Sequence, residues 1–101
     1  MYPEFMADEA AEYFDEFNML WSDESPIDVK AGRLVAIAVS AAIRCEYCIS
    51  AQVHSAKMAG ATDDEIKAAI QIAAEIQRFS TLLYGNDFGI ERLEKILGVM
   101  D

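Results

Sequence analysis

Two cysteines lie three residues apart near the middle of the chain, in the segment RCEYCISAQVH. They are Cys45 and Cys48, the only cysteines among 101 residues, and His54 at the end of the segment is the only histidine. Side chains three residues apart share one face of a helix, so the two sulfur atoms can form a disulfide after a modest adjustment. If a helix begins at the pair, its free N–H groups stabilise a thiolate, the nucleophile of thiol–disulfide exchange. The pair therefore favours a redox-active dithiol.

Other uses of two nearby cysteines fit the sequence less well, although one alternative stays open. Structural zinc takes four ligands, whereas the chain has two cysteines and one histidine, so a zinc site would have to be shared between subunits. Covalent haem attachment needs a histidine directly after the second cysteine, where the chain has Ile49. No βαβ pattern of a thioredoxin fold surrounds the motif. We expect no metal and no cofactor besides the dithiol; the alternative is two buried cysteines acting as small apolar side chains.

The acidic charge of the chain is concentrated in its N-terminal part. The net charge is −10, and residues 1–29 hold nine acidic and no basic side chains, while residues 30–101 hold eight bases and nine acids. Such a surface disfavours nucleic acid and anionic membranes as partners. No apolar run reaches the roughly 20 residues of a membrane-spanning helix, and the opening residues MYPEF lack the parts of a secretory signal. We therefore expect a cytoplasmic protein.

The hydrophobic pattern predicts an all-α fold in one domain, 1–101, with an acidic helix and turn over 1–28 and a core over 29–101. We expect Ser25 to cap the second helix, with Pro26 at its first position. Gly60 should end the third helix, and the capping box from Thr62 to Glu65 should open the fourth. Apolar residues at three-to-four spacing indicate five helices and no strand, over 7–21, 26–44, 46–59, 62–84 and 87–98.

Two of these helices have more apolar surface than a chain of this length can bury. The second helix is apolar on all sides from Leu34 to Ile43, so it must be covered on every side. The first helix carries a large aromatic face that also needs a partner, made of Tyr13, Phe14, Phe17 and Trp21. Burial of helix faces between subunits resolves this conflict, so we expect an oligomer.

The residues on both sides of the cysteines resemble those of one family. The string LVAIAV over 34–39, the motif CEYCI over 45–49 and the string AGAT over 59–62 are similar to the carboxymuconolactone decarboxylase / alkyl hydroperoxidase D family. The resemblance covers about residues 10–100 and is densest from Val29 to Ile70. It implies an all-helical fold that assembles as a trimer or a hexamer. Peroxidase-type members carry the C-x-x-C pair, whereas decarboxylase-type members generally lack it, so the pair points to the redox branch.

The resemblance also implies a proton relay, and here the chain departs from it. Peroxidase-type members have a glutamate twelve residues before the first cysteine and a histidine four residues after the second; this chain has Arg33 and Gln52 there. In a regular helix His54 should not face Cys48, because six residues turn the side chain about 120° away. It could help at the site only from another subunit or through a local distortion of the helix. We expect His54 to be exposed or at an interface. Arg33 would instead favour a thiolate by its charge, and Gln52 can donate or accept a hydrogen bond but cannot act as a base.

These features predict a thiol–disulfide oxidoreductase or a weak alkyl hydroperoxide reductase with an altered relay. The resemblance implies a small hydroperoxide or disulfide as substrate and a thiol as electron donor. It also implies that Cys48 attacks peroxide and that Cys45 resolves the product. One alternative is a non-catalytic oligomeric scaffold of the same fold. Another is a decarboxylase of cyclic acids, in which Arg33 would bind a substrate carboxylate.

Overall fold

A computed structural model describes residues 1–99 as helices joined by turns. Within this range there are five α-helices and no strand, as the hydrophobic pattern predicted. A short 3-10 helix precedes the first of them. The elements in chain order are η1 (Glu4–Met6), α1 (Ala7–Met19), α2 (Val29–Ala42), α3 (Glu46–Met58), α4 (Asp63–Gly85) and α5 (Ile90–Leu97). No helix in the described range is both long enough and apolar enough to span a membrane.

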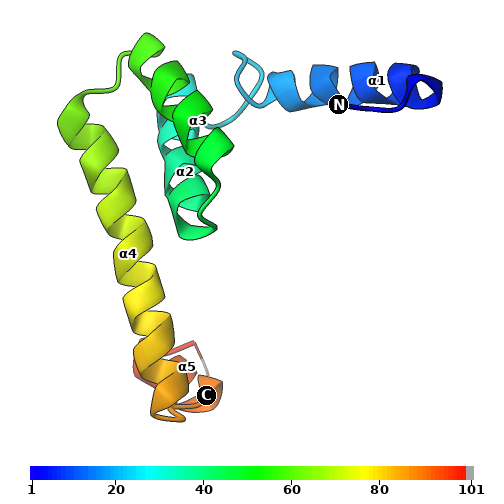
Figure 1. Ribbon diagram of the computed structural model, residues 1–101. Helices are drawn as coiled ribbons and strands as arrows, with labels where there is room; N and C mark the ends of the chain where they lie inside the picture. The colour runs from blue at the N-terminus through cyan, green and yellow to red at the C-terminus, as the bar shows by residue number, and fades with distance from the viewer. Residues whose placement is uncertain (100–101) are drawn as a thin grey trace.

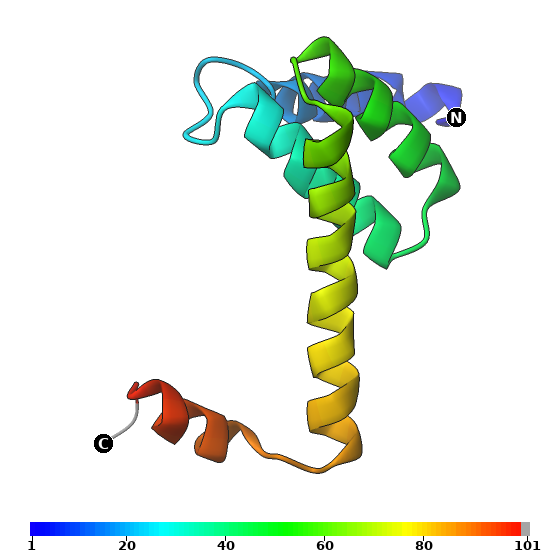
Figure 2. The same cartoon turned by 90° about the vertical axis from the view of Figure 1, so that its left-hand side faces the viewer.

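Helices α2, α3 and the first half of α4 pack together, while α1 and α5 extend away from them. Helix α2 packs against both α3 and α4, and Figure 1 shows α1 leaving this group as an arm. Figure 2 shows α4 as one straight helix with α5 turning off its far end. The radius of gyration is 17.8 Å, against about 13 Å for a compact chain of 100 residues. The chain therefore has an open shape with a small core at one end.

The core lies between α2, α3 and the start of α4. Ile37 is fully buried at its centre, and the other buried residues of the cluster are Ala56, Ile66 and Ala69. Several large apolar residues outside this core are exposed: Val39 on α2 is 54% exposed and Ile76 on α4 is 66% exposed. In a single chain, part of the apolar surface of α2 is thus exposed. We had expected this helix to be covered on every side.

The expected start of α2 was wrong by three residues. Helix α2 begins at Val29, and its N-cap is Asp28, whose carboxylate accepts the N–H of Ala31 at 2.9 Å. The hydroxyl of Ser25 accepts the N–H of Ile27 at 3.3 Å instead. Ser25 is therefore used inside the turn, and the better-placed carboxylate three residues later caps the helix.

The other helix ends follow the expected capping signals more closely. The capping box is present: the Thr62 hydroxyl accepts the Glu65 N–H at 3.1 Å, and the Glu65 carboxylate accepts the Thr62 N–H at 2.9 Å. Gly60 adopts the expected left-handed backbone with φ of 93°. Helix α5 begins at Ile90 rather than at 87, because Asp87 has a left-handed φ of 49° that breaks the helical path.

Candidate redox site

The link between α2 and α3 places the first cysteine. Arg44 has a left-handed φ of 57°, its N–H donates to the carbonyl of Ala41 at 3.2 Å, and the N–H of Cys45 donates to the carbonyl of Ser40 at 3.0 Å. These two bonds form a Schellman motif, in which the left-handed position is usually glycine. The motif ends α2 and reverses the chain at once, so Cys45 stands directly at the start of α3.

Cys45 is the N-cap of α3 and is bonded to Cys48. The Cys45 sulfur accepts the backbone N–H of Cys48 at 3.2 Å. The two cysteines form a disulfide, with their Cα atoms 5.2 Å apart, and both residues are half-buried. The expected pairing of the C-x-x-C motif at the beginning of a helix is confirmed. The sulfur of Cys45 therefore lies where the backbone N–H groups and the dipole of α3 favour negative charge.

The two residues at the relay positions contact each other. Arg33 lies on α2 and Gln52 on α3, and Nη1 of Arg33 donates to Oε1 of Gln52 at 2.9 Å. Gln52 follows Cys48 by four residues, so it lies on the same face of α3, one turn further along. Burial lowers the pKa of the Arg33 guanidinium from its ordinary value. The structure thus brings Arg33 to the cysteine-bearing face of α3.

Trp21 belongs to this cluster, although we had assigned it only to the aromatic face of the first helix. The Arg33 guanidinium carbon lies 3.9 Å from the centre of the Trp21 ring, within the range of a cation–π interaction. The ring rests on Gly32, where an added Cβ would come within 3.3 Å of Trp21 Cζ3. The glycine directly before Arg33, inside an otherwise helical pattern, was the sequence signal for a close contact at this position.

His54 lies apart from the cysteines. It is exposed on α3, whereas Cys48 and Gln52 are half-buried. This agrees with the helix phase, which turns His54 away from the face that holds the disulfide. Over residues 1–99, no group of three or more histidine, cysteine, aspartate or glutamate side chains is arranged to hold a metal ion.

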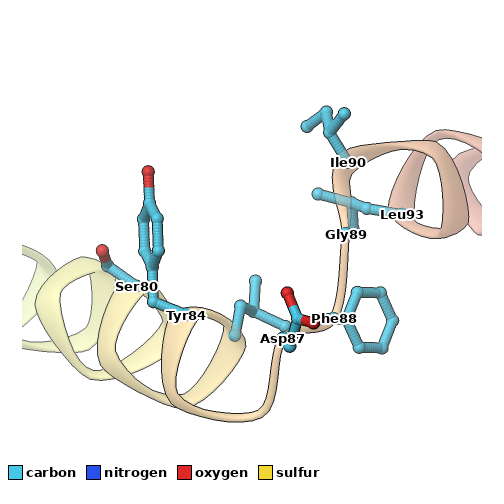
Figure 3. A pocket seen from close by; sticks show the side chains of 8 residues that line it. Ser80, Tyr84, Asp87, Phe88, Gly89, Ile90 and Leu93 are labelled. Atoms are coloured by element: carbon cyan, nitrogen blue, oxygen red, sulfur yellow. The ribbon is translucent and has the colours of Figure 1, made fainter.

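A separate hollow lies at the corner between α4 and α5. Its volume is about 300 Å³, and Figure 3 shows its side chains coming from the end of α4, the connecting turn and the beginning of α5. It is lined by Ser80, Leu83, Tyr84, Asp87, Phe88, Gly89, Ile90 and Leu93. None of these residues belongs to α2 or α3, so the hollow is distinct from the disulfide site.

Comparisons with known proteins identify relatives of the region that holds the disulfide. A family profile described as "Carboxymuconolactone decarboxylase family" matches residues 8–86. A curated protein of Paracoccus denitrificans, "Uncharacterized protein 4 in cox locus", is 31% identical over 78 residues, which make up 77% of this chain. The chain spans only 63% of the length of that relative. No solved structure matches the chain significantly.

Proposed function

The chain belongs to the carboxymuconolactone decarboxylase family, and we propose that within this family it is a dithiol–disulfide oxidoreductase. The observation that carries the proposal is the Cys45–Cys48 disulfide at the N-terminus of α3. A sulfur that accepts a helix N-terminal N–H stays stabilised as a thiolate after the bond is reduced. Such a thiolate is a good leaving group on reduction and a good nucleophile on oxidation.

The reductive half of the cycle uses two donor thiols. A donor thiolate attacks one sulfur of the disulfide, forms a mixed disulfide and releases the other cysteine as a thiolate. A second donor thiolate then attacks the donor sulfur of the mixed disulfide, which releases the donor disulfide and the remaining cysteine thiolate. Two electrons pass from two donor thiols to the protein. Cys45 is the better leaving group of the two, because its sulfur accepts the Cys48 N–H.

In the oxidative half of the cycle, the protein passes these two electrons to a small disulfide or a hydroperoxide. With a hydroperoxide, a cysteine thiolate attacks the outer oxygen, the O–O bond breaks, and an alcohol leaves together with a sulfenic acid on the protein. The second cysteine attacks that sulfur, forms the disulfide and releases water. The helix geometry favours Cys45 as the attacking sulfur, in contrast to the role that the family resemblance implies for Cys48.

Arg33 and Gln52 make disulfide exchange the more suitable reaction. Peroxide reduction gains from a general base that removes the thiol proton, and neither a guanidinium nor an amide does so at neutral pH. A positive charge near the cysteines still favours thiolate over thiol. We therefore propose that Arg33 and Gln52 support a thiolate by charge and hydrogen bonding, with only slow hydroperoxide reduction.

The shape of the chain supports an oligomeric enzyme, and the family resemblance implies a trimer or a hexamer. An extended chain with exposed apolar residues on α1, α2 and α4 gains stability when these faces pack against other copies. The proposed partners besides other copies are a small disulfide or hydroperoxide and a thiol donor. Such donors are plentiful in the reducing cytoplasm, where we place the protein.

A non-catalytic scaffold of the same fold is the second candidate. The replacement of the implied acid and histidine by Arg33 and Gln52 favours it, because a protein that has lost peroxide turnover no longer needs a proton relay. Reactivity of the cysteines separates the two candidates. A scaffold needs no accessible sulfur, whereas an oxidoreductase must exchange its disulfide with small thiols.

The test is a count of free thiols in the folded protein before reduction, after mild dithiol treatment and after re-oxidation with a small disulfide. We expect zero, two and zero thiols per chain. The variants Cys45→Ser and Cys48→Ser each leave one sulfur, and that of Cys48→Ser should be alkylated faster at neutral pH. Cysteines that resist both reduction and alkylation in the folded protein would instead support the scaffold.

A further inference from the structure

Arg33 is a half-buried cation without a carboxylate partner in a strongly acidic chain. The chain has 18 acidic and eight basic side chains, and the ion pairs in its described part are Lys30–Glu65, Lys57–Asp63 and Arg78–Glu75. Burial lowers the pKa of Arg33 with no opposing effect of an acid. By contrast, Glu65 raises the pKa of Lys30, which lies three residues before Arg33. The basic group that is bonded to Gln52 is thus left without a negatively charged partner.

The groups around Arg33 supply hydrogen-bond donors in excess of acceptors. A guanidinium has five N–H donors, and one bond, to Gln52 Oε1, is formed within residues 1–99. The indole Nε1 of Trp21 is buried, and within residues 1–99 it has no hydrogen-bond acceptor. Buried donors cost free energy unless they are paired. A carboxylate is the planar acceptor that best matches a guanidinium.

We propose that Arg33 binds the carboxylate of a small thiol whose sulfur exchanges with the Cys45–Cys48 disulfide. This proposal rests on the function proposed above and names its substrate class: short aliphatic thiols that carry a carboxylate. Gln52, which is bonded to Arg33, lies one helical turn beyond Cys48, about 6 Å along the axis of α3. A chain of a few carbon atoms spans such a distance. Arg33 is therefore a substrate-binding residue that selects by charge.

The exchange itself follows the two steps given above. The substrate thiolate attacks the disulfide while its carboxylate is held on Arg33, and a cysteine thiolate leaves. A second substrate thiolate attacks the sulfur of the bound substrate and releases the substrate disulfide. Two substrate thiols are oxidised, and the protein disulfide is reduced to two thiols. Arg33 undergoes no chemical change and acts only by holding the carboxylate.

The experiment compares two probes that differ only in charge, 3-mercaptopropionate and its neutral amide 3-mercaptopropionamide. The rate at which each reduces the disulfide is measured for the wild type and for Arg33→Gln, Arg33→Lys and Arg44→Gln. The ratio of the anionic to the neutral rate should fall about tenfold in Arg33→Gln, which corresponds to about 1.4 kcal/mol of lost binding. Arg33→Lys should keep part of the preference. Arg44→Gln removes the same charge from an exposed position and should keep the wild-type ratio.

The outcomes separate this inference from the function on which it rests. An unchanged ratio in Arg33→Gln, with both probes still reducing the disulfide, overturns the role of Arg33 and leaves the oxidoreductase intact. So does an equal loss in Arg44→Gln, because a general effect of positive charge around the disulfide would then explain the preference. If neither probe reduces the disulfide of the wild type, the proposed function fails as well. Should Arg33→Gln not fold, inhibition by propionate of the reaction with 3-mercaptopropionate supports the site in the wild type, and a lack of inhibition overturns it.

Discussion

Nη1 of Arg33 and Oε1 of Gln52 lie 2.9 Å apart and join α2 to α3 one helical turn beyond Cys48. These are the positions at which the family resemblance implies an acid and a histidine. A hydrogen bond from a guanidinium to an amide fixes the two side chains but moves no proton. The contact between the two helices at these positions therefore includes no group that can relay a proton at neutral pH.

The bond between Arg33 and Gln52 should be measurable as a coupling energy. Hydrogen bonds to charged groups contribute about 1.5–3 kcal/mol, so a double-mutant cycle with Arg33→Met and Gln52→Ala should give about 1–2 kcal/mol for this half-buried pair. Free energies of unfolding in urea provide the four values. The exposed pair Gln71–Glu75, 3.0 Å apart on α4, is the matched control and should give less than about 0.5 kcal/mol. A coupling no larger than that of the control would contradict the prediction.

Arg44→Gly should stabilise the protein. Arg44 has a left-handed backbone that costs a residue with a Cβ atom roughly 1–2 kcal/mol, a cost that glycine avoids. Part of this gain is offset by the greater freedom of glycine in the unfolded chain, so we expect an increase of about 1 kcal/mol in the free energy of unfolding. The reverse substitution serves as a control: Gly60→Ala, at a φ of 93°, should lower the free energy of unfolding by a similar amount. A decrease in stability for Arg44→Gly would show that its side chain outweighs the backbone effect.

The pair Lys30–Glu65 should make stability depend on pH on the acidic side. Lys30 and the Thr62 N–H lower the pKa of Glu65 in the folded protein. Its contribution is therefore present above the unfolded pKa of about 4.3 and is lost as the pH falls through the lower folded value. Glu65→Gln keeps the capping-box hydrogen bond but removes the charge.

The measurement is the urea midpoint of the wild type, Glu65→Gln and Lys30→Gln at pH 7 and at pH 3. Both variants should be less stable than the wild type at pH 7, and both differences should shrink at pH 3, which lies below the unfolded pKa of Glu65. The pKa of Lys30 is raised by the same contact, so its contribution is lost only when the pH rises beyond about 10.4. Differences that are equal at the two pH values would rule out the ion pair as their cause.

The exposed apolar face of α4 should be buried between subunits. Sedimentation velocity should show the wild type as a species several times larger than one chain of 11.2 kDa. Ile76→Glu places a charge on a side chain that is 66% exposed in one chain, and it should dissociate the assembly because a buried unpaired charge is costly. Gln71→Glu adds the same charge to an exposed polar position of α4 and should leave the assembly intact. A wild type that sediments as one chain would contradict the prediction.

Local signals in the sequence were sufficient for most helix ends and for the cysteine pair. The capping box at Thr62 and the left-handed Gly60 follow from residues within a few positions of each other. The start of α2 was harder to predict, because Ser25 and Asp28 are both good N-caps and only the turn decides between them. The left-handed Arg44 gives no local signal, since arginine has no preference for that conformation.

Contacts between helices were less predictable than the helices themselves. Family spacing singled out Arg33 and Gln52, but their hydrogen bond depends on how α2 packs against α3. The position of Trp21 over Arg33 depends on the path of the turn that follows α1. Such contacts follow from the fit of side chains across the whole core, which no short stretch of sequence determines.

The short span of the disulfide has a consequence for how redox state and folding are related. Cys45 and Cys48 are separated by three positions, and closing so small a loop removes little entropy from the unfolded chain, roughly 2 kcal/mol in the loop-closure treatment against about 4.7 kcal/mol for a 100-residue loop. Both cysteines already belong to one helix and its cap. Opening the disulfide should therefore cause no large loss of stability in α3. If the pair cycles as proposed above, the protein would gain and give up two electrons while its helices stay in place.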